Sequence, residues 1–299
     1  MGGAPERRDS LTATLLLLAV TAVWGSTFAM TKDVVAEVPV MDFLGVRFLL
    51  AAVVVAVLFP RSLRGLTGAT LRRGVVLGLL YGVAQVAQTV GLQHTAASVS
   101  GFVTGMYVVC TPLLAALLLR ERLPAVTWAA VPLAAVGIAV LSLRGVALGF
   151  GEGITLVGAV LYALHIVALG AWSTPAEAVR ISVVQLAVIA VLGLAFGAPG
   201  GITLPSSTGV WLQVVYMAVF AAGLALAAQT WAQAHLPPTR AAIIMCTEPV
   251  FASLFGILIG GESLTGRLLV GGSIVLAAML LAEAGPRRHV ESEVPHLTV

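Results

Sequence analysis

The chain contains little charge. Asp, Glu, Lys and Arg make up 10% of its 299 residues, compared with roughly 25% in soluble domains, whereas hydrophobic residues make up 59%. This composition excludes an ordinary soluble globular protein. Cysteine is also scarce: Cys110 and Cys246 both fall within apolar segments, where we interpret them as small apolar fillers. The sequence therefore gives no indication of a disulfide framework or of a metal-binding cysteine pair.

Long polar stretches are absent between residues 11 and 284, where apolar segments follow one another closely. A helix needs about 20 apolar residues to cross a hydrocarbon core of about 30 Å, so each segment can span a membrane. The connections are too short for a soluble domain, and the first segment is longer than a signal-peptide core. The sequence predicts an all-α integral membrane protein with ten transmembrane helices, at residues 11–31, 41–59, 74–94, 98–119, 125–143, 153–171, 177–197, 210–234, 239–260 and 266–284.

The chain repeats itself. Four sets of residues recur 141 positions later, namely Gly82 as Gly223, Gln88-Thr89 as Gln229-Thr230, His94 as His235 and Glu121 as Glu262. We therefore divide the chain into a first five-helix repeat (1–148), a second (149–284) and a polar cytoplasmic tail (285–299). Because five is odd, the second repeat enters the bilayer from the opposite side. Inverted repeats that meet at the midplane are typical of secondary transporters.

The placement of the basic residues predicts the orientation. If both termini lie in the cytoplasm, twelve arginines fall on the cytoplasmic side, and only Lys32, Arg144 and Arg267 fall on the other. This asymmetry follows the positive-inside rule, so we expect both termini in the cytoplasm. The net charge of +3 thus reflects membrane topology and not nucleic-acid binding. The cytoplasmic set is Arg7, Arg8, Arg61, Arg64, Arg72, Arg73, Arg120, Arg122, Arg180, Arg240, Arg287 and Arg288.

Two charged residues lie well inside predicted spans: Arg47 in the second and Glu248 in the ninth. A charge at that depth costs roughly 2.5–3.5 kcal/mol on insertion scales, so both should face the bundle interior or water. Pro249 is expected to bend the ninth helix beside Glu248. Glu248 and Arg47 are candidates for a ligand or proton-coupling site. The alternative is that they pair with each other, or with backbone groups, and only stabilise the bundle.

Several polar and aromatic residues fall near mid-span. Tyr81, Gln85 and Gln88 share one face of the third span, because they recur at helical spacing. Such groups suit a small zwitterionic or amphipathic solute, although buried tyrosines and glutamines also serve as contacts between helices. The remaining candidates for substrate binding are Trp24, Ser26, Tyr107, Tyr162, His165, Gln229 and Trp231. No metal site is expected.

His94 and His235 end the third and eighth spans. Inversion of the repeats would bring them to opposite faces of the membrane, where they are candidates for two gates. Ordinary capping of helices at the membrane interface is the other interpretation.

The run Trp24-Gly25-Ser26-Thr27-Phe28, the pairs Arg47-Phe48 and Glu248-Pro249, and the span endings at Glu121 and Glu262 together resemble the EamA family of the drug/metabolite transporter superfamily. The resemblance extends over about residues 11–284. It implies ten spans with both ends inside and a central cavity lined mainly by spans one, three, four, six, eight and nine. It also implies export of amino acids, other small metabolites or drugs.

Motifs of intramembrane enzymes are lacking. The sequence has no His-Glu-x-x-His helix, no aspartate pair within spans and no ATP-binding loop, and Ser273 has no suitably placed histidine. We therefore predict a gradient-driven exporter that works by alternating access, in a bacterial cell membrane, with an uncoupled uniporter as the alternative. A small solute and membrane lipid are the expected partners, protons the candidate coupling ion, and a homodimer is compatible with the sequence. No cofactor is expected.

Overall fold

Long apolar helices make up most of the computed structural model, which describes residues 4–119, 125–144, 147–172, 177–225, 228–229, 232 and 244–283. Apart from one two-residue β-ladder, the elements in these residues are helical. In chain order they are α1 (Ala4–Glu37), α2 (Val40–Leu58), η1 (Pro60–Leu63), α3 (Gly68–His94), α4 (Ala97–Gly105), α5 (Tyr107–Leu119), α6 (Ala125–Ser142), β1 (Leu143–Arg144), β2 (Ala147–Leu148), α7 (Phe150–Trp172), α8 (Ala178–Gly197), η2 (Ala198–Gly200), α9 (Thr208–Tyr216), the π-helix η3 (Met217–Leu224), α12 (Glu248–Leu258) and α13 (Gly266–Glu283).

Within these residues, six helices are long and apolar enough to cross a membrane. The other predicted spans contain shorter apolar helices, so the count of ten stays a prediction. Large hydrophobic side chains point outward along the bundle: Val57 is 71% exposed, Leu117 74% and Phe196 69%. Such an apolar surface is unfavourable in water and is satisfied by lipid. The six long segments are Leu11–Glu37, Val40–Leu58, Gly68–His94, Ala97–Leu118, Phe150–Trp172 and Val179–Gly200.

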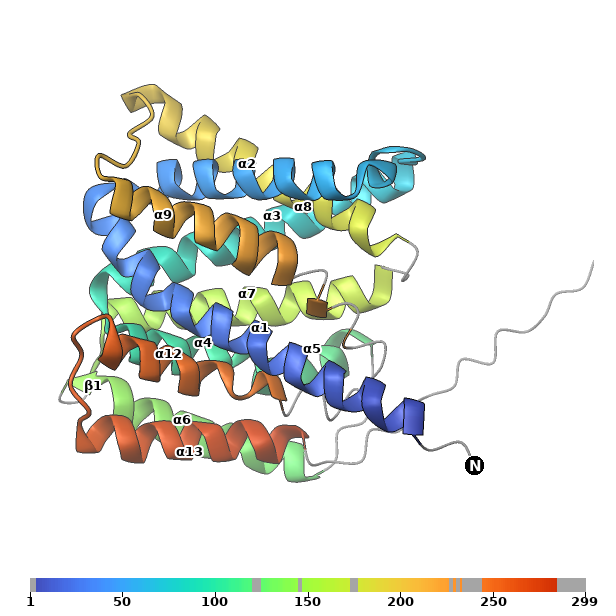
Figure 1. The fold of residues 1–299 in the computed structure, drawn as a ribbon. Coiled ribbons are helices and arrows are strands. Elements are labelled where there is room, and N and C mark those ends of the chain that lie inside the picture. The colour runs from blue at the N-terminus through green and yellow to red at the C-terminus, as the bar shows by residue number, and fades with distance from the viewer. Residues whose placement is uncertain are drawn as a thin grey trace, which may run out of the picture.

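Two apolar cores lie on either side of the bundle. One joins α2 and α8 with α9 and η3, around Phe43, Phe48 and Met217. The other joins α6 and α13 with α4 and α5, around Phe102 and Met279. Figure 1 shows α2 and α8 at one edge and the α6–α13 pair at the opposite edge, while α1 runs obliquely across the bundle. This arrangement leaves α1, α3, α7 and α12 in the middle.

Glycines permit the closest helix contacts. A Cβ atom at Gly25 in α1 would lie 2.5 Å from the Cβ of Phe251 in α12, so these two helices approach backbone to backbone. Gly101 in α4 meets Ala252 of α12 in the same way, and Gly78 in α3 meets Val188 and Gln185 of α8. Small residues therefore place α12 between α1 and α4, and fasten α3 to α8.

Two predicted spans are interrupted. The fourth span divides at Met106, between α4 and α5. We expected Pro249 to bend the ninth helix beside Glu248; the structure interrupts the helix at this place, because residues 246–247 form a turn and α12 begins at Glu248. Pro249 thus lies in the first helical turn, where its missing N–H is not needed for a helical hydrogen bond.

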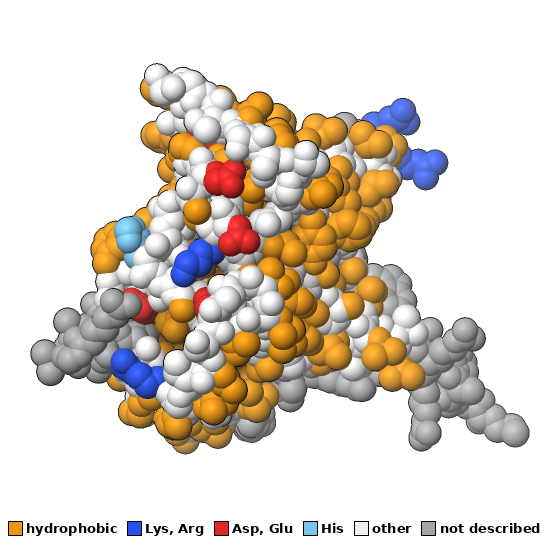
Figure 2. Space-filling view, turned by 60° about the vertical axis from the view of Figure 1, so that its left-hand side comes forward, with side chains coloured by type: hydrophobic (Ala, Val, Ile, Leu, Met, Phe, Trp, Pro, Cys, Tyr) orange, Lys and Arg blue, Asp and Glu red, His pale blue; other side chains and the backbone are white. Residues whose placement is uncertain are grey.

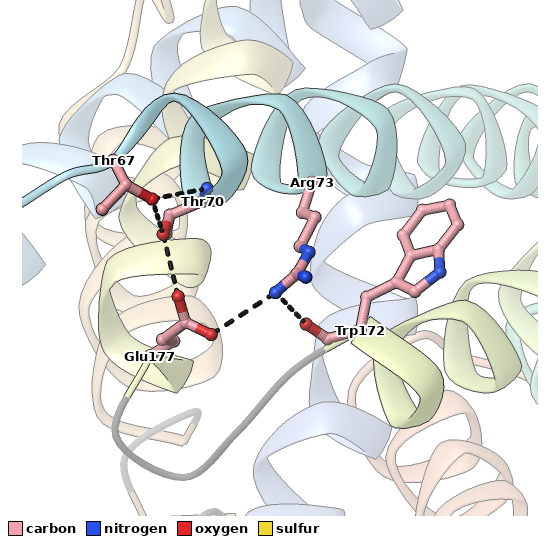
Figure 3. Close-up of polar contacts among 5 residues, drawn as sticks. All are labelled: Thr67, Thr70, Arg73, Trp172 and Glu177. Atoms are coloured by element: carbon pink, nitrogen blue, oxygen red, sulfur yellow. Dashed lines mark hydrogen bonds and ion pairs between the residues drawn. The ribbon is translucent and has the colours of Figure 1, made fainter. Parts of the chain in front are cut away.

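The connections gather at the two ends of the bundle (Figure 1). At the end that holds the N-terminus, here called the proximal end, the connection between α2 and α3 meets the start of α8. Arg73 Nη1 lies 3.6 Å from Glu177 Oε2 and donates to the Trp172 carbonyl at 3.2 Å, while Thr70 donates to Glu177 Oε1 at 2.8 Å (Figure 3). These contacts tie the first half of the chain to the second.

The opposite, distal end is built from the other connections. β1 pairs antiparallel with β2 there, and the Thr203 amide donates to Asp42 Oδ2 at 2.8 Å. Figure 2 turns this end forward: Lys, Arg, Asp and Glu side chains gather near its centre, and hydrophobic side chains cover the adjoining flank. The predicted tail 285–299 lies outside the described residues.

Candidate functional site

A cavity of about 240 Å³ lies between the two apolar cores. It is lined by residues of α1, α2, α3, α4, α5, α7, α8 and η3, by Gln229, and by the residues around the start of α12. α6 and α13, at the edge of the bundle, contribute no residue to it. The lining consists of Trp24, Thr27, Phe28, Thr31, Arg47, Phe48, Tyr81, Gln85, Gln88, Thr89, Leu92, Thr104, Tyr107, Tyr162, His165, Ile166, Leu169, Ser182, Gln185, Leu186, Ala221, Ala222, Gln229, Met245 and Glu248.

One wall of the cavity is aromatic. The Tyr81 ring stacks on the His165 ring with centroids 5.1 Å apart and lies 5.5 Å from the Tyr162 ring. Phe48 meets Tyr81 edge to face at 6.2 Å. Rings in such contact fix one another's positions and offer a flat apolar surface with polar edges.

Hydrogen bonds connect this wall to the neighbouring helices. The Tyr162 hydroxyl donates to Gln88 Oε1 at 2.9 Å, and Gln88 Nε2 donates to Thr104 at 3.1 Å. Gln85 Nε2 donates to the Tyr81 hydroxyl at 3.1 Å. These bonds join α3 to α7 and α4, and hold side-chain amides and hydroxyls at the surface of the cavity, where a solute could exchange bonds with them.

Arg47 brings a cation to the cavity from α2. Its side chain is only 7% exposed, and its guanidinium carbon lies over the rings of Phe48 at 5.3 Å and Phe43 at 5.8 Å. The single ion pair within the described residues is that of Arg73 and Glu177. The alternative of a direct Arg47–Glu248 pair is therefore wrong for this structure.

Glu248 brings a carboxyl group from the first turn of α12. The Tyr107 hydroxyl, at the start of α5, donates to Glu248 Oε2 at 3.3 Å. Both residues begin a helix directly after a break, and they stand 141 positions apart. Discontinuous helices that meet at mid-depth are characteristic of solute sites in secondary transporters.

Two further contacts are related to each other by the same interval of 141 residues. Gln88 Nε2 donates to Thr104, and Gln229 Nε2 lies 4.0 Å from the Met245 sulfur. Each acceptor follows its glutamine by 16 positions, and the two contacts are 141 positions apart. The two halves of the chain thus present related side chains to one cavity.

The π-helix η3 offers a further polar contact. Trp24 Nε1 in α1 donates a hydrogen bond of 2.9 Å to the carbonyl oxygen of Ala221 in this π-helix. Ala221 and Ala222 also line the cavity. π-helical segments are rare and are frequent at functional sites. The bond fixes the indole ring of Trp24 at the cavity wall.

The cavity has an apolar lining toward the distal end. Phe28 and Leu92 form its floor there and pack with Ala97 and Ala252 in a small apolar cluster, here called the distal seal. These four buried side chains pack between α1, α3, α4 and α12, and close packing of apolar side chains excludes water.

Polar contacts lie just beyond the distal seal. Lys32 Nζ donates to the Thr95 carbonyl at 2.7 Å, and the Thr95 hydroxyl donates to Glu152 at 2.8 Å. Glu262 accepts hydrogen bonds from the amides of Ala97 and of Ser98, the latter at 3.1 Å. This carboxylate caps the N-terminus of α4, whose first amides have no partner within the helix.

Most of the predicted site residues line the cavity. Ser26 does not: its hydroxyl donates to the Val23 carbonyl and bonds to the Tyr216 hydroxyl at 3.0 Å, because it faces α9. His94 lies away from the cavity, edge to face with Phe150 at 5.1 Å. Trp231 and His235 are outside the described residues. Within those residues, no group of side chains suits a metal ion.

Sequence reasoning missed the contribution of α8. Gln185 is buried, lines the cavity and bonds to His165 at 2.6 Å, and Ser182 lies one turn earlier. A lone glutamine within the apolar segment 177–197 was an available signal. No such signal was available for the threonines in the cavity lining, because a threonine also suits an ordinary contact between helices. These are Thr27, Thr31, Thr89 and Thr104.

Comparison with known proteins agrees with this geometry. An uncharacterized transporter of Archaeoglobus fulgidus is 28% identical over 279 residues, which cover 93% of this chain and 88% of that protein. The uncharacterized inner membrane transporter YedA of Escherichia coli K12 is 28% identical over 276 residues, or 89% of each chain. A solved crystal structure superposes with a TM-score of 0.66 at 19% identity, over 90% of this chain and 96% of the other, and so shares the fold.

The family model described as the EamA-like transporter family matches this sequence twice, over residues 11–143 and again over residues 149–283. The two matches together cover nearly all the membrane-embedded part of the chain. The resemblance stated from the motifs is confirmed: the protein is a multi-pass membrane protein and belongs to the EamA-like transporter family.

Proposed function

We propose that this protein is a secondary transporter that exports a small metabolite, such as an amino acid or a drug-like solute, by alternating access through the central cavity. One observation carries the proposal: a polar and aromatic cavity of about 240 Å³ lies between the two apolar cores and is bounded toward the distal end by the apolar cluster of Phe28, Leu92, Ala97 and Ala252. A cavity of this size suits a small solute. A seal on one side is what alternating access requires of each state.

The proposed topology is ten spans in two inverted repeats, 1–148 and 149–284, with both termini in the cytoplasm. The charges at the two ends support it. Arg61, Arg64, Arg72, Arg73 and Arg180 lie at the proximal end, whereas the basic residues near the distal end are Lys32, Arg144 and Arg267. By the positive-inside rule the proximal end is cytoplasmic. The cavity is then closed toward the outside, in a bacterial inner membrane such as the one that YedA is named for.

Within the cavity, the aromatic wall of Tyr81, Tyr162 and His165 is proposed to hold the apolar body of the solute. Rings supply contact area without requiring one exact ligand shape. The amide groups of Gln85, Gln88 and Gln229, together with Trp24 and Tyr107, are proposed to bond to its polar groups; Trp231, outside the described residues, stays a prediction.

Glu248 is proposed to couple transport to protons. It lies in the cavity, within bonding distance of Tyr107 and without an ion pair among the described residues. A carboxyl group at this position can bind either a proton or a cationic group of the solute, so proton and solute compete for it. This competition is a sufficient basis for exchange of solute against protons.

Reconstitution tests the proposal. The purified full chain is placed in proteoliposomes loaded with a panel of amino acids and small drug-like amines, and efflux is measured with and without an imposed pH gradient. Efflux of at least one solute that the gradient accelerates supports the proposal. Efflux that a gradient does not change supports an uncoupled uniporter. No flux from a well-folded preparation across the panel contradicts a transport role for these solutes.

A further inference from the structure

Arg47 is a buried cation that the protein itself leaves without an anion. Only 7% of the surface of Arg47 is exposed, and its Nε atom has no hydrogen-bond acceptor. Its guanidinium group lies over the rings of Phe43 and Phe48. Such rings stabilise a cation but accept no conventional hydrogen bond. A guanidinium has five N–H donors, and burying them without acceptors is unfavourable.

The position of Arg47 in the fold shows where an acceptor could come from. Arg47 lines the cavity beside Phe48 and Tyr81, so its terminal nitrogens can be reached from the cavity. α2 packs mainly on α8 and η3, and neither of these two helices contains an acidic residue. The acceptor for the Arg47 guanidinium must therefore be a group of the ligand that occupies the cavity.

We propose that Arg47 is the anion subsite of the transport cavity and binds the carboxylate of the solute. The proposal rests on the proposed function and names the class of solute: carboxylate-bearing compounds with an apolar body. A guanidinium matches a carboxylate through two parallel N–H···O bonds, which are stronger in a cavity than in water.

Glu248 argues for a carboxylate in preference to a phosphate. Glu248 is the acidic residue among those that line the cavity, and it lies at the start of α12. A phosphate dianion in the same small volume would meet a second negative charge, whereas a carboxylate brings one. A solute that also carries an ammonium group would satisfy Glu248 and Arg47 together.

The test uses matched ligands and the full chain in lipid nanodiscs, with binding measured by calorimetry. The probes are phenylalanine, 3-phenylpropanoate, phenylalaninamide, phenethylamine and phenyl phosphate, with leucine and leucinamide as an aliphatic pair. The variants are Arg47→Gln, Arg47→Lys and the control Arg72→Gln, which removes an equal charge from an exposed position at the proximal end.

We expect the wild-type protein and Arg72→Gln to bind at least one acid about tenfold more tightly than its amide, as a charge-assisted hydrogen bond predicts. Arg47→Gln should bind the acid and the amide equally. Arg47→Lys should retain part of the preference for the acid, because lysine keeps the positive charge but cannot form two parallel hydrogen bonds to a carboxylate. Should Arg47→Gln not fold, the wild-type ratio and the Arg47→Lys ratio still test the proposal.

Three results would overturn the carboxylate subsite: no acid binding better than its amide, an undiminished preference in Arg47→Gln, or tighter binding of phenyl phosphate than of 3-phenylpropanoate. Efflux from proteoliposomes distinguishes failure of the carboxylate subsite from failure of the proposed transport function. Efflux of a carboxylate solute that Arg47→Gln leaves unchanged leaves transport standing and removes the subsite. Acid binding that depends on Arg47, without any flux, retains the subsite and removes the transport proposal.

Discussion

The Tyr107 hydroxyl donates to Glu248 at 3.3 Å, and these two residues occupy matching positions, 141 residues apart. Each is the first residue of a helix that starts after a break, at Met106 in one case and at residues 246–247 in the other. In the proposed inverted-repeat topology, a contact between matching positions falls on the axis that relates the two halves. The interface of the repeats is also where secondary transporters bind their solutes and coupling ions.

Glu248→Gln should therefore uncouple transport. The change keeps the shape of the side chain and an acceptor for Tyr107 but removes the proton-binding group. We expect solute binding to be retained and acceleration by a pH gradient to be lost in proteoliposomes. Tyr107→Phe is the companion variant: it keeps the carboxyl group, so gradient-driven flux should persist. Full gradient-driven flux in well-folded Glu248→Gln protein would contradict a coupling role.

Orientation is tested by cysteine accessibility in a background of Cys110→Ala and Cys246→Ala. Arg64→Cys, in the connection between α2 and α3, should react with a membrane-impermeant maleimide only from the cytoplasmic side. Ser206→Cys, between η2 and α9, should react only from outside. Both residues are exposed, so labelling reports side and not burial. The reverse pattern at either position would contradict the inverted-repeat topology.

Glu262→Ala should weaken closure of the distal end. The carboxylate caps α4 through the amides of Ala97 and Ser98, and loss of a helix cap costs about 1 kcal/mol, or about fivefold in an equilibrium. In the background of Cys110→Ala and Cys246→Ala, Thr27→Cys, a cavity residue that precedes Phe28 on α1, should react several-fold faster with a maleimide added outside. Glu177→Ala, at the proximal end, is the matched control and should not accelerate this reaction.

Gly25→Ala should disrupt the contact between α1 and α12. The added methyl group would lie 2.5 Å from the Cβ of Phe251 and 2.7 Å from the amide nitrogen of Ala252, and overpacking of this kind costs about 1–3 kcal/mol. The expected result is a lower melting temperature in detergent. Gly170→Ala in α7 is the control, because a Cβ there meets nothing within 4 Å. Equal melting temperatures for the two variants would show that α1 and α12 separate readily.

Much of the site could be predicted from the sequence, because a membrane core penalises polar groups. Arg47, Gln88 and Glu248 stand out within apolar segments, and each lines the cavity. Ser26 was assigned wrongly for a related reason: a small hydroxyl can satisfy itself on the preceding turn, as Ser26 does on the Val23 carbonyl, so its presence says little about the direction it faces.

The sequence by itself determined that the chain crosses a membrane repeatedly, that its halves are related, and to which family it belongs, because apolar length, charge placement and repeated residues are properties of the chain alone. Only the tertiary structure decided that the ninth span breaks before Glu248, that Gln185 joins the cavity, and that Arg47 meets aromatic rings and not Glu248. Those outcomes depend on which helix faces are brought together by close packing at glycines such as Gly25 and Gly101, and no local pattern encodes that pairing.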